Sequence, residues 1–187
     1  MAINRYRENN FPVKLTWNST GKHIVRIENA ISSINVGTTK NLYSVRIGQA
    51  IKKIDNDCFS DCSNLSSISF AQPFVNSSTG ENVPGTTIDD IGDRAFLSCS
   101  SLSAVKFNGD IVTNRIGQKA FANSAISSMT VTTKYIDDYA FTSCKNLKTL
   151  NINVDNNIGT EAFSYCPLLN SAAVNAKNIG KHAFSES

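Results

Sequence analysis

A segment of seventeen residues recurs with variations along this chain, and this repeat constrains the fold more than any other feature. It reads IGDRAFLSCSSLSAVKF at 91–107, IDDYAFTSCKNLKTLNI at 136–152 and IGTEAFSYCPLLNSAAV at 158–174. Its anchor is a phenylalanine that follows an isoleucine by five residues, at Phe59, Phe96, Phe121, Phe141, Phe163 and Phe184. These phenylalanines are spaced by 37, 25, 20, 22 and 21 residues. A period near 22 with one long exception predicts a solenoid.

Each copy ends in a hexapeptide with apolar residues at its first, fourth and sixth positions, such as LSSISF and LKTLNI. The fourth and sixth side chains lie on one face of a strand and the fifth on the other. A lone strand cannot bury that apolar face, whereas strands stacked roughly 4.8 Å apart can. The sequence therefore predicts a β-rich repeat solenoid with a parallel sheet, joined by short turns or helical turns. We expect phenylalanine to fill the interior, and glycine to permit the turn backbone.

The run I-x-x-I-G-x-x-A-F-x-x-C-x-x-L-x-x-I-x-F resembles the BspA-type leucine-rich repeat. The resemblance covers about residues 42–187. It implies a curved parallel-sheet solenoid of the kind found in surface proteins of host-associated bacteria and protozoan parasites. It also implies adhesion or protein recognition rather than catalysis.

Residues 1–40 do not follow the repeat, so we expect a separate N-terminal β cap or attachment unit before a solenoid over 41–187. The segments VKLTW, HIVRI and ISSINV alternate in polarity and are joined by turn residues. ISSINV and LYSVRI lie 11 residues apart, too close for a full coil. We therefore predict a small antiparallel β unit over 13–36. The opening MAINRYRENNFPVKLTW also resembles the first strand of phage tail and baseplate accessory proteins, which implies attachment to a virion.

The long spacing in the repeat comes from AQPFVNSSTGENVPGTT at 71–87. Its two prolines, two glycines and polar middle predict an inserted loop or hairpin that projects from the coil edge. Surface loops accept such insertions readily, so a tolerated excursion is one interpretation. The other is a contact loop in which Phe74 and Val75 anchor a partner.

The five cysteines follow the repeat rather than a ligand or nucleophile pattern. Four share one repeat position, and the fifth occupies the slot that alanine fills elsewhere: Cys62, Cys99, Cys144, Cys166 and Cys58. We predict free, buried thiols, although neighbouring coils would bring pairs within reach of a disulfide. Neither His23 nor His182 has the sequence context of a catalytic group. The sequence therefore predicts no catalytic residue, no cofactor and no enzyme.

Two acidic clusters, DNDCFSD at 55–61 and IDDIGD at 88–93, have a composition similar to calcium loops. Neither has the glycine and distal glutamate of an EF-hand, and solvated aspartates are ordinary in turns. We predict no metal site.

Exposed positions of the repeat are the predicted partner surface, since the repeated positions are interior. The fifth hexapeptide positions carry small or charged side chains without aromatics, which disfavours stacking of sugars or bases. The net charge of +3 is too small and scattered for nucleic acid, and no apolar run is long enough to span a membrane. The candidate partner-binding residues are Arg46, Phe74, Val75, Lys106, Tyr139, Lys148, Asn151 and Tyr165.

These observations favour a non-enzymatic protein-recognition or adhesion module associated with a cell surface or a virion. No secretory signal is visible at the start of the chain. The alternative is an assembly protein that joins a larger particle through its N-terminal unit and through its C-terminal end, IGKHAFSES, which stops within a coil.

Overall fold

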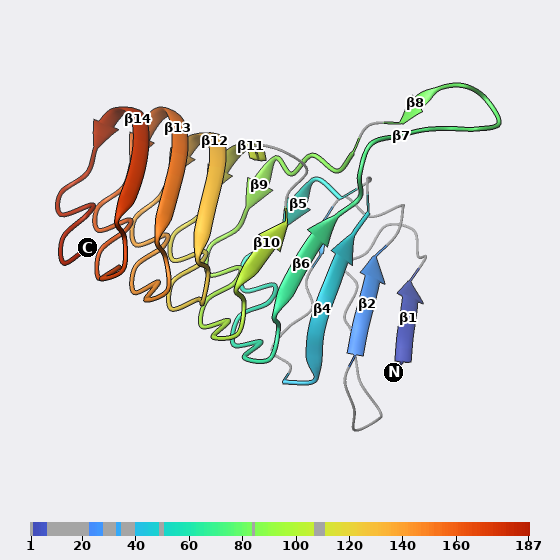
Figure 1. Ribbon diagram of the computed structural model, residues 1–187, viewed down its shortest axis with the longest axis horizontal. Helices are drawn as coiled ribbons and strands as arrows, with labels where there is room; N and C mark the ends of the chain where they lie inside the picture. The colour runs from blue at the N-terminus through green and yellow to red at the C-terminus, as the bar shows by residue number, and fades with distance from the viewer. Residues whose placement is uncertain are drawn as a thin grey trace.

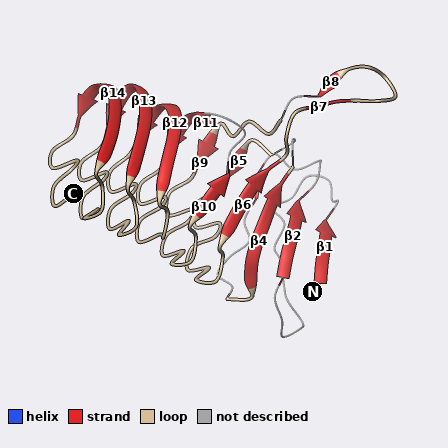
Figure 2. Ribbon diagram, in the orientation of Figure 1, coloured by secondary structure: helices blue, strands red, loops and turns tan. Residues whose placement is uncertain are grey.

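The computed structural model describes residues 2–6, 23–27, 33–34, 40–48, 51–83, 85–106 and 111–187, and every structural statement below concerns these residues. They form strands connected by turns, with no helix among them (Figure 2). The strands are β1 Ala2–Tyr6, β2 His23–Ile27, β3 Ser33–Ile34, β4 Leu42–Ile47, β5 Lys53–Ile54, β6 Ser67–Phe70, β7 Phe74–Val75, β8 Asn82–Val83, β9 Asp90–Ile91, β10 Ala104–Lys106, β11 Ile111–Ile116, β12 Ser128–Ile136, β13 Thr149–Ile158 and β14 Ser171–Ile179.

The coils stack in parallel, as the repeat predicted, and their strands form two sheets rather than one (Figure 1). Sheet A has the order β1-β2-β4-β6-β10 and is built from hexapeptide strands. Sheet B has the order β14-β13-β12-β11-β9-β5-β3 and contains the isoleucines that precede each turn. In the last three coils the two strands merge, so β12, β13 and β14 each run from the hexapeptide to the isoleucine without a break.

The prediction of an antiparallel N-terminal unit is wrong for the strands described there. β1 pairs in parallel with β2, β2 with β4, and β3 with β5. The segments ISSINV and LYSVRI lie close in sequence because they belong to different sheets: β3 is in sheet B and β4 in sheet A. The parallel architecture therefore reaches β1, while the predicted strand VKLTW lies outside the described residues.

The interior contains a continuous column of stacked phenylalanine rings. Consecutive ring centroids lie 4.9–5.2 Å apart and the planes differ by at most 14°. The first five rings of the column are fully buried, at Phe59, Phe96, Phe121, Phe141 and Phe163. One ring per coil thus fills the space between the turn and the two sheets.

Each turn places two residues in the left-handed backbone region, one two positions before its phenylalanine and one two positions after it. In the coil of Phe141 these are Tyr139, with φ 60°, and Ser143, with φ 59°. Their amides and that of Phe141 donate hydrogen bonds to carbonyls of the next coil, at 2.9, 2.8 and 2.7 Å. The same three donors recur in the preceding turns. The turns therefore form a third hydrogen-bonded ladder beside the two sheets.

The repeat glycines serve close packing and not the turn conformation that we expected. None of them has a positive φ. A Cβ added at Gly159 would lie 2.5 Å from the carbonyl carbon of Asp137 in the preceding coil, well inside van der Waals contact. The coils approach so closely here that only hydrogen fits.

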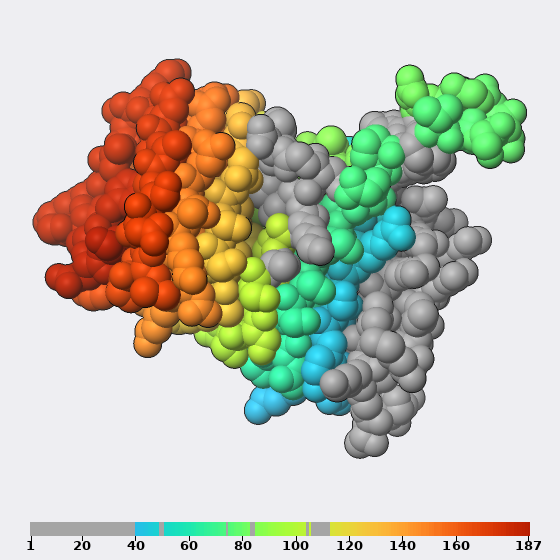
Figure 3. All heavy atoms as spheres, viewed as in Figure 1, coloured from blue at the N-terminus to red at the C-terminus, as the bar shows by residue number. Residues whose placement is uncertain are grey.

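The insertion at 71–87 contains a hairpin, and we call residues 74–83 the arm. Its strands β7 and β8 pair antiparallel. The base is closed by Ala71 and Thr86, whose amides donate to Thr86 Oγ1 at 3.0 Å and to the Ala71 carbonyl at 2.9 Å. The arm stands clear of the solenoid in both the ribbon and the space-filling view (Figures 1 and 3).

Candidate functional site

The exposed face of sheet A brings two of the predicted partner-binding residues into one row. Arg46 of β4 is in register with Ser69 of β6, and Ser69 is in register with Lys106 of β10. The side chain of Arg46 is exposed. All three stand at the fifth hexapeptide position, and the exposure of Arg46 shows that this position of β4 faces away from the core.

Lys148 and Asn151 are exposed further along the solenoid, where the strands belong to sheet B. Lys148 precedes β13, and Asn151 is in register with Thr130 and Ala173. The exposed positions around Asn151 carry small hydroxyl and amide side chains. They can form hydrogen bonds with a partner but offer little apolar area.

The two predicted tyrosines lie at the turns, away from the sheet A face. Tyr139 is half-buried, and Lys119 Nζ lies 5.5 Å from the centroid of its ring. Tyr165 is 55% exposed and belongs to the following turn, at the position after the phenylalanine rather than before it. Tyr165 is thus the more accessible anchor of the two.

The arm carries the last two predicted residues. Val75 is 62% exposed, the most exposed of the large hydrophobic side chains in the described part of the chain. Phe74 pairs with Val83 across the hairpin. At the tip, the Asn76 amide donates to the Glu81 carbonyl at 2.8 Å, and Gly80 adopts a φ of 72°. The predicted residues therefore fall in four places: sheet A, the exposed side of β13 in sheet B, the turns and the arm.

The cysteines lie inside, as predicted, and all five are free and buried. Three of the thiols also donate to a phenylalanine carbonyl of the preceding coil: Cys99 to Phe59 at 3.1 Å, Cys144 to Phe121 at 3.2 Å, and Cys166 to Phe141 at 3.4 Å. Burial raises the pKa of Cys99 and of Cys166, and raises that of Cys144 to about 12. These groups are neutral donors in the core and poor nucleophiles.

Aspartates of both acidic clusters pair with basic side chains of the protein. Arg94 forms two hydrogen bonds with Asp57, from Nε to Oδ1 at 2.7 Å and from one terminal nitrogen to Oδ2 at 2.8 Å. Lys53 Nζ lies 3.4 Å from Asp90 Oδ2. No group of three or more potential metal ligands occurs within the described ranges.

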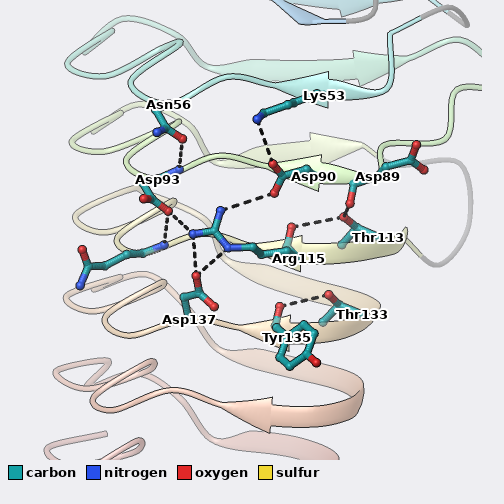
Figure 4. A network of polar contacts seen from close by, with 11 residues as sticks. Lys53, Asn56, Asp89, Asp90, Asp93, Thr113, Arg115, Thr133, Tyr135 and Asp137 are labelled. Atoms are coloured by element: carbon teal, nitrogen blue, oxygen red, sulfur yellow. Dashed lines mark hydrogen bonds and ion pairs between the residues drawn. The ribbon is translucent and has the colours of Figure 1, made fainter.

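A third basic side chain, that of Arg115, contacts three carboxylates from neighbouring coils (Figure 4). Its Nε donates to Asp137 at 2.8 Å, and its terminal nitrogens contact Asp137 at 2.7 Å, Asp90 at 3.5 Å and Asp93. Burial raises the pKa of the Asp137 carboxyl, while Arg115 opposes that rise. We call this group the Arg115 cluster.

The Arg115 cluster lies beside an open, polar depression of about 390 Å³. The lining residues are Asp93, Arg115, Gln118, Tyr135, Ile136, Asp137, Asp138, Asn157 and Gly159. Tyr135 is 42% exposed there. This cluster was not among the predicted sites. One feature of the sequence could have indicated it: Asp90 and Arg115 have opposite charges and occupy the same repeat position, directly before the isoleucine.

Across the described part of the chain, helices of the length and hydropathy needed for a membrane span do not occur. No curated protein matches the chain at a significant level.

Comparison with solved structures shows the same fold in a bacterial protein. A crystal structure of a leucine-rich repeat protein from T. pallidum aligns with a TM-score of 0.58 and 18% sequence identity, over 84% of this chain and 72% of that one. A leucine-rich repeat protein from Bacteroides ovatus aligns with a TM-score of 0.42 and 21% identity over 87% of this chain. The aligned region is 52% of the B. ovatus chain, about half of its length.

A family model, the BspA type leucine rich repeat region, matches residues 24–83 and 71–187 with six copies. The match covers most of the sequence and includes every phenylalanine of the stacked column. With the parallel coils and the column of rings, it confirms the resemblance that the motif indicated. The chain belongs to the BspA-type leucine-rich-repeat family.

Proposed function

We propose that this protein is a non-enzymatic recognition or adhesion module in which the solenoid is a scaffold and the arm makes the principal contact with a protein partner. Leucine-rich repeats generally mediate protein interaction, and the family is typically non-enzymatic. The observation that carries the proposal is the exposure of Val75 on an ordered hairpin that the coil does not need, because the bonds between Ala71 and Thr86 close its base.

The sheet A face supplies a second, polar contact in this proposal. Arg46 and Lys106 share one row there with the hydroxyl residue Ser69. An apolar anchor flanked by polar groups is the usual composition of a protein interface. We propose that the module is located at a cell surface or on a virion. The cell-surface location is in keeping with the surface proteins that the repeat resembles.

The experiment places a photoreactive amino acid at position 75, and in a control chain at position 165. Irradiation in an extract of the source organism or of its host, followed by mass spectrometry, identifies the partner joined to position 75. Binding of that purified partner is then measured with two variants: residues 74–83 replaced by Asn-Gly, and the surface control Lys145→Ala, an exposed residue outside the proposed contacts.

The proposal expects the arm replacement to weaken binding about tenfold or more, because apolar anchors dominate protein interfaces. It also expects Lys145→Ala to bind nearly as wild type. A partner that binds the arm-replaced chain as tightly as the wild type contradicts the proposal. Cross-linking to a second copy of this chain, with a defined oligomer in light scattering, would favour the assembly alternative through residues 1–40 and the C-terminal coil.

A further inference from the structure

The strands of sheet A contain basic residues and no acidic ones. They read AINRY, HIVRI, LYSVRI, SISF and AVK, for β1, β2, β4, β6 and β10. Sheet B contains both signs of charge, with Asp90 in β9 and Asp155 in β13 as well as Arg115 in β11. The five strands of sheet A lie side by side at the N-terminal end of the stack (Figure 1). Positive charge is therefore concentrated on one sheet.

The register of sheet A collects these basic residues in a single row. Arg5 pairs with Arg26, Arg26 with Arg46, Arg46 with Ser69, and Ser69 with Lys106. Residues in register in a parallel sheet occupy the same face, and neighbouring strands lie about 4.8 Å apart, so the row is roughly 19 Å long. We call these five residues the cationic row. Its neighbours are 20 to 37 residues apart in the chain, so the sequence alone does not reveal it.

Arg46, in the middle of the cationic row, is available to a ligand. Its side chain is exposed, and it forms no ion pair with another residue in the described part of the chain. By contrast, Arg94 pairs with Asp57, and Arg115 contacts three aspartates. The protein thus neutralises those two arginines with its own carboxylates but leaves the charge of Arg46 uncompensated. Uncompensated charge of one sign attracts a ligand of the opposite sign.

The spacing and chemistry of the cationic row fit a linear anionic polysaccharide. A guanidinium binds oxyanions such as carboxylate through two parallel hydrogen bonds. A polysaccharide with an anionic group on successive sugars presents its charges along one line, as the row does. An acidic peptide in an extended conformation fits less well, because its side chains recur on one face only about every 7 Å. Single-stranded nucleic acid binds through bases stacked on aromatic side chains, and the row contains no aromatic residue.

We propose that the cationic row is a binding site for an acidic polysaccharide, one whose sugars carry sulfate or carboxylate groups. Ionic contacts and hydrogen bonds hold the polysaccharide along the row, so the site needs no aromatic stacking. The row gives sheet A a ligand in addition to the protein partner of the arm. This inference is independent of the arm, because residues 74–83 contribute nothing to the row.

Calorimetric titration of the full chain with heparin, polygalacturonate and neutral dextran tests the proposal. Heparin carries sulfate and carboxylate groups and polygalacturonate carboxylates alone, so the comparison identifies the anion that is bound. The double variant Arg26→Ser/Arg46→Ser removes two charges from the row. The control Lys145→Ser/Lys181→Ser removes the same charge from two exposed positions elsewhere. Circular dichroism verifies that each variant is folded.

A second pair of variants adds a charge instead of removing one. Ser69→Arg places a cation at the one uncharged position of the cationic row. Asn151→Arg is its control, because it adds the same charge at the fifth hexapeptide position of β13, outside the row. A site that reads the row responds to the first substitution and not to the second.

The proposal predicts that at least one of the two acidic polysaccharides binds and that dextran does not. Arg26→Ser/Arg46→Ser should weaken binding about tenfold or more and lower the slope of log affinity against log salt concentration by roughly two. Ser69→Arg should strengthen binding severalfold. Both control variants should stay within about twofold of wild type, since screened charges away from the row contribute little.

Three results would overturn the proposal: neither acidic polysaccharide binds at low salt, the two double variants lose affinity equally, or single-stranded DNA binds the row more tightly than both polysaccharides. The second result would mean that net charge alone attracts the polyanion. The chain with residues 74–83 replaced by Asn-Gly should bind heparin as wild type does. The heparin titration and the partner-binding experiment on the arm can therefore fail separately.

Discussion

Cys144 shows how a single repeat position combines packing with hydrogen bonding. Its thiol is fully buried and donates to the Phe121 carbonyl of the preceding coil. Ser187 occupies the equivalent position in a later copy, and its hydroxyl donates to the Phe163 carbonyl at 2.6 Å. Cysteine and serine share this slot because both are small and both can donate to a carbonyl that the turn leaves inside the coil.

We expect Cys144→Ala to lower the free energy of unfolding by about 1–3 kcal/mol, because it leaves a small void and removes one of the two donors to the buried Phe121 carbonyl, which also accepts from the Ser124 amide. Cys144→Ser, which keeps a donor, should cost less. Urea unfolding of the two variants measures the difference. An alanine variant as stable as wild type, or a serine variant less stable than the alanine one, contradicts this account of the thiol.

The carboxyl of Asp137 should titrate above its ordinary value of 3.8, because burial raises its pKa more than Arg115 lowers it. Since the folded pKa is the higher one, ionisation of Asp137 lowers stability as the pH rises from 3.8 through the folded pKa. Asp137→Asn should remove that slope. In Arg115→Gln the NMR-detected pKa should rise further, and a fall would show that Arg115 does not stabilise the carboxylate.

Much of the interior was predictable residue by residue, and the contacts between coils were not. The column of phenylalanines and the burial of Cys144 follow from their repeat position alone. The carbonyl that Cys144 bonds lies 23 residues away, so it depends on how the coils align. The Arg115 cluster was missed for the same reason. Its carboxylates lie 22 to 25 residues from Arg115, and the three of them occupy three different positions of the repeat.

At the scale of elements, the turn is the part of each coil whose backbone conformation and packing are most constrained. It holds two residues in the left-handed region, and its glycine packs against the preceding backbone. Charged or polar residues such as Arg94 and Asn123 occupy the left-handed positions. The ladder of amides that joins successive turns offsets that backbone cost.

Gly159→Ala should destabilise the protein by about 1–3 kcal/mol, because the new methyl group overlaps the backbone of Asp137. Gly80→Asn is the control: Gly80 has a φ of 72° with open space around it, and asparagine tolerates that conformation. Thermal unfolding of both variants compares steric crowding with backbone freedom. Equal losses in the two would mean that crowding is not what selects glycine in the turn.

The strands were predictable from the alternation of apolar residues, but their assignment to sheets was not. ISSINV and LYSVRI have the same pattern, and nothing in that pattern states that one belongs to sheet B and the other to sheet A. Sequence spacing alone suggested a hairpin, because adjacent strands usually pair. These two strands do not pair because each of the early coils contributes one strand to each sheet, so strands that follow each other in sequence lie in different sheets.

For the whole molecule, repetition separates scaffold from surface. The repeated residues build the interior and the three ladders, whereas the arm and the fifth hexapeptide positions vary. The proposed contact at Val75 belongs to the one segment that interrupts the repeat. The proposed contact therefore depends on a departure from a regular stack of coils.

That parallel stack is the central claim, and cross-linking between coils tests it most directly. Thr130 and Asn151 are register partners on the exposed face of β12 and β13, so cysteines introduced at both positions should lie roughly 5 Å apart and form a disulfide under mild oxidation. Cysteines at Thr130 and Thr149 are displaced by two residues, about 8 Å apart, and should remain reduced. Efficient cross-linking of the displaced pair and not of the register pair would contradict the parallel coil structure.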